Sequence, residues 1–249
     1  MSPLLISVLT LAALGAGFID AIAGGGGLIT VPALLAAGLP PHLALGTNKG
    51  QSVFGSGAAL VRFARAGLIE KRASVPLFAL GLLGSWVGAA LALWLESAVL
   101  RPIVLVLLVA VTPLIFVRVR PAAFGSRLTR LGPLALAVVV GAYDGFFGPG
   151  TGTLLILGFV ALGRSPVAAT AEAKVINFAS NLAALSLFAY RGNVLLAVAL
   201  PMAGAQLVGG HLGAHAAVRG GERVVKAVLT LVVVALVLKL ARDVWLVSS

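Results

Sequence analysis

Long apolar runs, interrupted by glycine, proline and a few charged residues, make up most of the chain. Runs of 18 or more apolar residues indicate membrane-spanning helices, and no alternation typical of strands interrupts them. The pattern therefore predicts an all-α, polytopic helical membrane protein with eight hydrophobic segments. In order, these cover residues 4–23, 43–64, 73–94, 99–117, 131–147, 167–190, 194–217 and 224–245.

The first and fifth segments are each broken by a cluster of glycines. Residues 24–27 read GGGG, and an apolar stretch resumes over residues 28–37. Residues 148–152 read GPGTG, and the stretch after them extends to residue 162. Glycine costs about 1 kcal/mol relative to alanine in a helix, and a break frees backbone groups that need partners. We expect both breaks to be non-helical, with close helix packing through small residues as the alternative explanation.

The two breaks belong to an internal repeat that covers the chain. Asp144 corresponds to Asp20, and Lys174 corresponds to Lys49. Further matching positions are Pro41 and Pro166, Phe63 and Phe188, Gly67 and Gly192, Pro76 and Pro201, Gly84 and Gly209, and Gly88 and Gly213. Most pairs are about 125 residues apart, half of the 249-residue chain. The predicted organisation is a first transmembrane repeat over residues 1–117, a basic linker over residues 118–130 and a second repeat over residues 131–249.

The topology depends on whether the broken segments cross the membrane. If every segment crosses once, the four-segment repeats are parallel. If each broken segment dips in and returns, each copy crosses three times and the repeats are inverted. The Lys/Arg totals on the two sides differ too little between these topologies to decide. Inverted repeats with broken helices recur in secondary transporters, which slightly favours the inverted arrangement.

Composition supports the membrane assignment. Hydrophobic residues make up 60% of the chain and charged residues 10%, whereas soluble domains carry about 25% charged residues. The formal net charge of +11 comes from basic residues in short loops, as the positive-inside rule predicts, and indicates no nucleic-acid interface. Both topologies place the loop at residues 62–72 and the linker in the cytoplasm. Because the apolar start lacks a basic n-region and recurs near residue 136, we expect it to belong to the mature fold.

An aspartate, a glycine break and a lysine recur in each copy within this apolar sequence. A charge at the bilayer centre costs roughly 2.5–3.5 kcal/mol on insertion scales, so such residues usually face a cavity or a partner. A helix that restarts after a break directs the positive end of its dipole at the break, and a lysine beside it completes a candidate anion site. The polar faces that begin with these lysines comprise Lys49, Ser52 and Ser56, and Lys174, Asn177 and Asn181.

The predicted site residues come from the breaks and the lysine-bearing helices. The substrate-binding candidates are Gly24, Gly25, Gly26, Gly27, Asn48, Lys49, Ser52, Gly148, Gly150, Thr151, Lys174, Asn177 and Asn181. The coupling candidates are Asp20, Asp144 and Glu172. The aspartates could also balance the lysines, cap the restarted helices, or pair with the lysines only to specify the fold. Glu172 has no acidic counterpart, does not face Lys174 on a helix, and has an interfacial surface position as its alternative.

Other chemistry has weaker support in the sequence. His211 and His215 lie four residues apart but lack the glutamate of the HExxH motif, so we predict no metal site and no cofactor. Ser56 lies in FGSGA rather than GxSxG, and no His–Asp set accompanies it. The chain has no cysteine and no GxxxxGK[ST] motif, so coupling to ATP would need another chain.

The paired motifs resemble those of a known family. The stretch GFIDAIAGGGGLITVPALLAAGLPPHLALGTNKGQS in the first half, with GAYDGFFGPGTGTLLILGFV and ATAEAKVINFASN in the second, resembles the TauE/SafE family, the sulfite exporter-like or TSUP membrane proteins. The match is to the branch with TNK in the first copy and YDGFFGPGTG in the second. The resemblance covers nearly the whole chain and implies a plasma-membrane transporter with two homologous halves. Several members are linked to sulfite, sulfoacetate or taurine-derived anions, but membership does not fix the substrate.

We therefore predict a secondary transporter for a small anion: sulfite, an organosulfonate or a carboxylate. The alternatives are an intramembrane enzyme that uses Asp20 and Asp144 as a carboxylate pair, and a structural membrane subunit. No nucleophile–base set accompanies the aspartates, and a scaffold has no need of buried charges in both copies, so neither alternative is favoured and no enzyme is expected. The expected partners are the anion, the lipid bilayer, H⁺ or Na⁺ as coupling ion, and a homodimer as an open possibility, without nucleic acid.

Overall fold

A computed structural model describes the backbone of residues 1–111, 113 and 126–248. Side chains are described for the same residues except 126–130, 222, 223 and 225–248. This part of the chain contains helices and no strand, which confirms the predicted all-α membrane fold. The predicted linker at residues 118–130 lies outside the described residues up to position 125, and the backbone of residues 126–130 begins a helix.

The helices follow the predicted apolar segments closely. Those of the first half are α1 Pro3–Ala23, α2 Gly27–Ala36, α3 Pro41–Arg65, α4 Lys71–Trp94 and α5 Ser97–Val111. Those of the second half are α6 Ser126–Phe146, α7 Thr151–Ala161, α8 Pro166–Tyr190 and α9 Leu196–Ser248. The last two predicted segments both lie in α9, where Gly221 (φ 55°, ψ −148°) separates two helical parts.

Serine and proline mark the starts of α1 and α8. Ser2 caps α1 by accepting a hydrogen bond from the Leu5 N–H, and Ser165 caps α8 by accepting one from the Ala168 N–H. A proline follows each cap, at the first turn, where its missing N–H would have no helical partner anyway. Local chemistry thus fixes where α1 and α8 begin.

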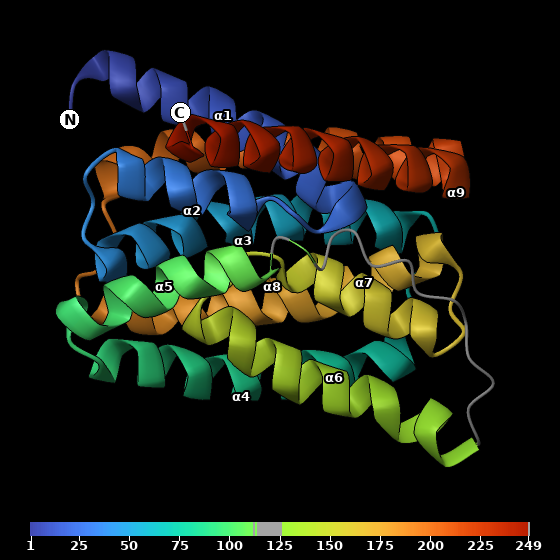
Figure 1. Cartoon of the computed structure of the whole chain (residues 1–249). Coiled ribbons are helices and arrows are strands. Elements are labelled where there is room, and N and C mark those ends of the chain that lie inside the picture. Colours follow the sequence, from blue (N-terminus) through green and yellow to red (C-terminus); the bar gives the residue numbers. More distant parts are fainter. Residues whose placement is uncertain (112, 114–125, 249) are drawn as a thin grey trace.

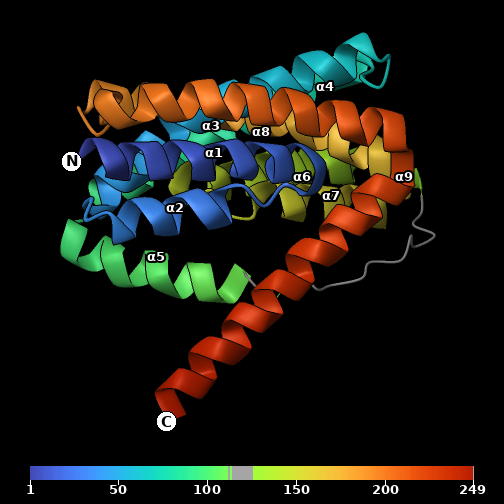
Figure 2. The same cartoon turned by 90° about the horizontal axis from the view of Figure 1, so that it is seen from above.

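The chain turns back after each glycine break. In Figure 1 it runs left to right through α1 and returns right to left through the shorter α2, whereas it runs right to left through α6 and returns through α7. The lysine-bearing helices α3 and α8 also run in opposite directions (Figure 1). Seen from above, the second part of α9 leaves the bundle and passes diagonally across α5 (Figure 2).

The first helix of each half of the chain packs against a helix of the other half. α1 lies along α9, and α6 lies along α4. Backbone contact is close, because the α9 glycine Gly209 has no room for a Cβ beside the Leu14 carbonyl, and Gly88 of α4 has none beside the Ala142 carbonyl. The glycines that the repeat shares on α4 and α9 therefore serve close helix packing across the copies, as small residues commonly do in membrane proteins.

The helices α3 and α8 form the centre of the bundle and carry most of its buried polar side chains. Each has 25 residues, and α3 contacts α8 and α9 while α8 contacts α4. Within the described residues, three helical stretches are long and apolar enough to cross a membrane: α1, α4 and Leu196–Gly221. The polar residues of α3 and α8 lower their hydropathy, and the surrounding helices shield those residues.

Candidate functional site: two crossed ion pairs between the glycine breaks

Two buried ion pairs join the copies, each between a lysine of one and an aspartate of the other. The Nζ of Lys49 lies 2.7 Å from Oδ1 of Asp144, and the Nζ of Lys174 lies 2.7 Å from Oδ2 of Asp20. Both lysine side chains are at most 1% exposed. The sequence indicated that each aspartate could balance a lysine, but it did not indicate that the partners lie in different copies.

Each aspartate bridges its break from the last turn of one helix to the start of the next. Asp20 accepts a hydrogen bond from the Gly26 N–H through its carboxylate, and its carbonyl accepts one from the Gly24 N–H. Asp144 accepts hydrogen bonds from the hydroxyls of Thr151 and Ser180. The aspartates therefore fix the geometry of the breaks in addition to neutralising the lysines.

The two breaks are shorter than the predicted ranges, because Gly27, Thr151 and Gly152 already lie in the first turns of α2 and α7. Gly24 ends α1 with φ 77°, a left-handed conformation that glycine adopts without strain. The breaks also touch: a Cβ on Gly24 would collide with the backbone of Gly152, and one on Gly152 would collide with Gly24. Glycine is therefore required here by both the turn and the crossing.

A small polar cavity lies between the crossed breaks. Its volume is about 20 Å³, room for about one water molecule. Its lining residues are Asp20, Gly24, Gly27, Asn48, Ser52, Asp144, Gly148, Gly152, Asn177 and Asn181. All except Gly152 are among the site residues that the sequence predicts. Of the other predicted residues, Lys49 and Lys174 adjoin the cavity through their aspartates.

The amide side chains around the cavity are held in fixed orientations. The Oδ1 of Asn48 accepts hydrogen bonds from the Thr30 hydroxyl, at 2.6 Å, and from the Gln51 amide, at 2.9 Å. Because its oxygen is occupied, the remaining capacity of the Asn48 side chain is as a donor. In the second copy, Asn181 donates to the Asn177 carbonyl. The cavity lining thus combines amide groups with the carboxylates of Asp20 and Asp144, and the lysine ammonium groups lie next to these carboxylates as their ion-pair partners.

Comparisons with known proteins give the family. The family model "Sulfite exporter TauE/SafE" matches residues 9–240. The chain belongs to the TauE/SafE family. It is 40% identical over 245 residues to the probable membrane transporter protein ORF9 of Sinorhizobium sp, covering 96% of this chain and 93% of that protein. It is 38% identical to the probable membrane transporter protein YfcA of Escherichia coli strain K12 (98% and 92% covered) and 36% identical to a probable membrane transporter protein of Haemophilus influenzae (96% and 95% covered). No solved structure matches the chain.

The predicted coupling residue Glu172 lies away from the central cavity of this TauE/SafE protein. Its Oε1 forms an ion pair with Nε of Arg164 at 3.1 Å, and the Arg164 side chain is 47% exposed. Both residues line a separate cavity of about 530 Å³, together with Glu70 and Arg72. The structure therefore groups Glu172 with the charged residues at the ends of α4 and α7, not with the aspartates.

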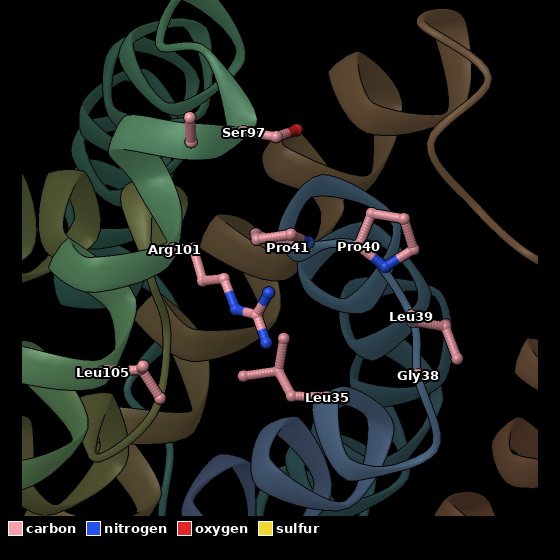
Figure 3. Close-up of a pocket in the computed structure, with 9 residues that line it drawn as sticks. Leu35, Gly38, Leu39, Pro40, Pro41, Ser97, Arg101 and Leu105 are labelled. Atoms are coloured by element: carbon pink, nitrogen blue, oxygen red, sulfur yellow. The ribbon is translucent and has the colours of Figure 1, made fainter.

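A further cavity of about 460 Å³ lies between α5 and the connection of α2 to α3. The Arg101 side chain extends from α5 into this space, towards Leu35 and the two prolines Pro40 and Pro41 (Figure 3). His42 binds Ser97 nearby and contacts the Ala92 carbonyl, which ties the start of α3 to the α4–α5 corner. Neither this cavity nor that of Glu172 shares a lining residue with the central one.

Several residues that shape the site carry no signal in the repeat pattern. Ser180 donates to Asp144, Thr30 donates to Asn48, and the Ser85 hydroxyl donates to the Ser180 carbonyl. Positions that match between the copies suggested the site, whereas Ser85 and Ser180 stand opposite glycines of the other copy. Comparing where the copies differ would have drawn attention to them.

Proposed function

We propose that this TauE/SafE protein is a secondary transporter of the plasma (inner) membrane that moves a small anion through the central cavity. The anion classes are sulfite, an organosulfonate or a related carboxylate. The observation that carries the proposal is the pair of buried lysines, Lys49 and Lys174, beside a polar cavity between two crossed helix breaks. The names of the relatives, probable membrane transporter proteins, support the transport class.

The anion would bind where positive groups converge. The ammonium groups of Lys49 and Lys174 supply full charge, the amide groups of Asn48 and Asn177 supply donors, and the starts of α2 and α7 supply helix dipoles. Backbone at the breaks approaches the cavity closely because glycines carry no side chain there. Because each lysine is paired with an aspartate, these groups are able to hold a compact oxyanion when the charge of one carboxylate is balanced.

Transport requires the central cavity to open. At about 20 Å³ it is smaller than sulfite or a sulfonate, so the anion enters only after helices that contain the breaks move. Because α1 packs on α9 and α6 packs on α4, each break belongs to a unit that includes a helix of the other copy. We propose that relative motion of these two units exposes the cavity alternately to each side, with inverted repeats and with the 62–72 loop and the linker in the cytoplasm.

The rival functions make different use of the aspartates. An intramembrane hydrolase needs a carboxylate free to act as acid or base, whereas Asp20 and Asp144 each bind a lysine. A purely structural subunit would use the ion pairs only to stabilise the fold. Buried ion pairs add little net stability, because desolvation of the charges offsets their attraction. The observed pairing therefore favours transport, with H⁺ or Na⁺ as coupling ion.

The experiment is flux through the purified protein in proteoliposomes. Vesicles loaded with buffer receive labelled sulfite, sulfoacetate or methanesulfonate outside, with and without a pH gradient or a Na⁺ gradient. We expect saturable uptake of at least one of these anions, and no uptake into vesicles with a Lys49→Met/Lys174→Met variant. Absence of flux of all three anions in the wild-type protein would contradict the proposal.

A further inference from the structure

The two ion pairs are not equivalent, although the repeat produces both. The Asp144 carboxylate binds Lys49, the Thr151 hydroxyl and the Ser180 hydroxyl, and its side chain is 2% exposed. Among the described residues, the Asp20 carboxylate binds Lys174 and one backbone N–H, that of Gly26 at 3.3 Å, and its side chain is 19% exposed. Asp144 is therefore the more firmly held of the two carboxylates.

The repeat shows why the pairs differ. Thr151 and Ser180 correspond to Gly27 and Gly55 of the first copy, so the positions that supply hydroxyls to Asp144 supply none to Asp20. Ser85, which donates to the Ser180 carbonyl, likewise stands opposite a glycine, Gly210. Asp144 thus accepts hydrogen bonds from two hydroxyls, whereas glycines stand at the corresponding positions of the first copy.

The charge of the site limits how an anion can enter. The two lysines and two aspartates sum to zero formal charge. A monovalent anion added between them would leave one negative charge unbalanced in a buried cavity, which is strongly unfavourable. Uptake of one proton by either carboxylate restores neutrality and also releases a lysine to bind the anion. Asp20 accepts fewer hydrogen bonds than Asp144, so fewer contacts must change when a proton is added there.

We propose that Asp20 takes up this proton and that Lys174 then binds the anion. The ion pair between Asp144 and Lys49 remains intact during this step. This inference rests on the proposed function and specifies its coupling. A proton from the aqueous phase adds to Oδ2 of Asp20, an O–H bond forms, and Lys174 remains an ammonium. One monovalent anion and one proton therefore enter together, and the step is electroneutral.

Asp20 and Asp144 are the titratable side chains that line the cavity among the described residues. Lys174 of α8 is the direct partner of Asp20, and across the cavity lie Asp144 of α6 and its partner Lys49 of α3. A change in protonation linked to anion binding therefore belongs to one of these two pairs, and the fewer contacts of the Asp20 carboxylate favour the Asp20–Lys174 pair.

The test measures how methanesulfonate binding depends on pH in the full chain in detergent or nanodiscs. Methanesulfonate keeps its single charge throughout, so any proton taken up is bound by the protein. In the wild-type protein we expect affinity to fall about tenfold per pH unit where Asp20 is ionised, because one proton accompanies each anion. Asp20→Asn should bind methanesulfonate with affinity independent of pH and should retain exchange between vesicle pools but lose acceleration by a pH gradient.

One hydroxyl variant and one control separate the aspartates. Ser180→Ala removes one donor to Asp144 and should keep the tenfold pH slope because Asp20 is unchanged. Ser186→Ala serves as a matched control, since the Ser186 hydroxyl bonds within its own helix, to the Ala183 carbonyl. An infrared band of a protonated carboxyl should appear on methanesulfonate addition in both variants and be absent in Asp20→Asn.

The outcomes are distinct. A pH slope that survives Asp20→Asn, or wild-type binding without proton uptake or with a Na⁺ requirement, would overturn the inference while leaving anion transport intact. If sulfite, sulfoacetate and methanesulfonate neither bind to the wild-type protein nor cross the vesicle membrane, the proposed function fails and the inference fails with it.

Discussion

Thr153 donates its hydroxyl hydrogen to the carbonyl oxygen of Ala23 at 2.8 Å, across 130 residues of sequence. Ala23 is the last residue of α1, where helix carbonyls have no partner in their own helix. Thr153 lies in the first turn of α7, just after the second break. A side chain at the start of α7 thus provides a hydrogen-bond donor for the last carbonyl of α1. This bond links the two breaks, so each stabilises the other.

Replacing this threonine should loosen the crossing of the breaks. Thr153→Val keeps the shape of the side chain but leaves the buried Ala23 carbonyl without its partner, which we expect to cost about 1–3 kcal/mol of stability. Thr10→Val is the control, since the Thr10 hydroxyl bonds to the Ile6 carbonyl of its own helix. Thermal unfolding in detergent compares the two. Equal melting temperatures for both variants would show that the crossing bond does not matter for stability.

Adding a methyl group at the crossing should be far more harmful. Gly152→Ala places a Cβ against the Gly24 backbone, and backbone cannot move aside as a flexible side chain can. We expect loss of most monodisperse protein in size-exclusion chromatography and of anion flux. Gly15→Ala in α1 adds the same atoms with nothing within 4 Å and should behave like the wild-type protein. A well-folded, active Gly152→Ala variant would contradict the close approach.

Removing one charge of the buried Asp144–Lys49 pair should destabilise the protein more than removing both. Asp144→Asn leaves the buried Lys49 ammonium without a counter-charge, a change that typically costs about 3–5 kcal/mol. The double variant Lys49→Met/Asp144→Asn should recover most of that loss. Arg164→Gln breaks the half-exposed pair with Glu172 and should cost at most about 1 kcal/mol. Chemical unfolding of the wild-type protein and these three variants gives the comparison, and a double variant no more stable than Asp144→Asn would contradict the pairing.

Exchanging the lysines for arginine should impair transport while preserving charge. Lys174→Arg introduces a guanidinium, which is planar and larger than an ammonium. The cavity of about 20 Å³ has little room for the larger group. We expect methanesulfonate exchange to fall at least about tenfold, by the cost of misplacing one charge-assisted hydrogen bond. Lys71→Arg, at the start of α4, is the matched control and should be neutral. Wild-type exchange by Lys174→Arg would place the binding site elsewhere.

The sequence predicted the helices, the two breaks and most cavity-lining residues, because each follows from local pattern. Apolar length gives the helices, glycine clusters give the breaks, and helical spacing puts Ser52 and Asn177 on the same faces as their lysines. The partners of Lys49 and Lys174 could not be predicted, because pairing across the copies depends on how α3 and α8 pass each other. Glu172 shows the same limit, since its position relative to the cavity is set by the ends of α4 and α7.

The crossed ion pairs also have a consequence for biogenesis. While the ribosome is still making the second half, Asp20 and Lys49 are already in the membrane, and their partners Lys174 and Asp144 do not yet exist. The nascent first half therefore contains an aspartate and a lysine whose final partners are still missing. Neither half expressed alone can complete either of the two crossed ion pairs, whereas two half-chains made in the same cell supply all four residues. The buried charges of this protein are therefore neutralised only when its two halves assemble with each other.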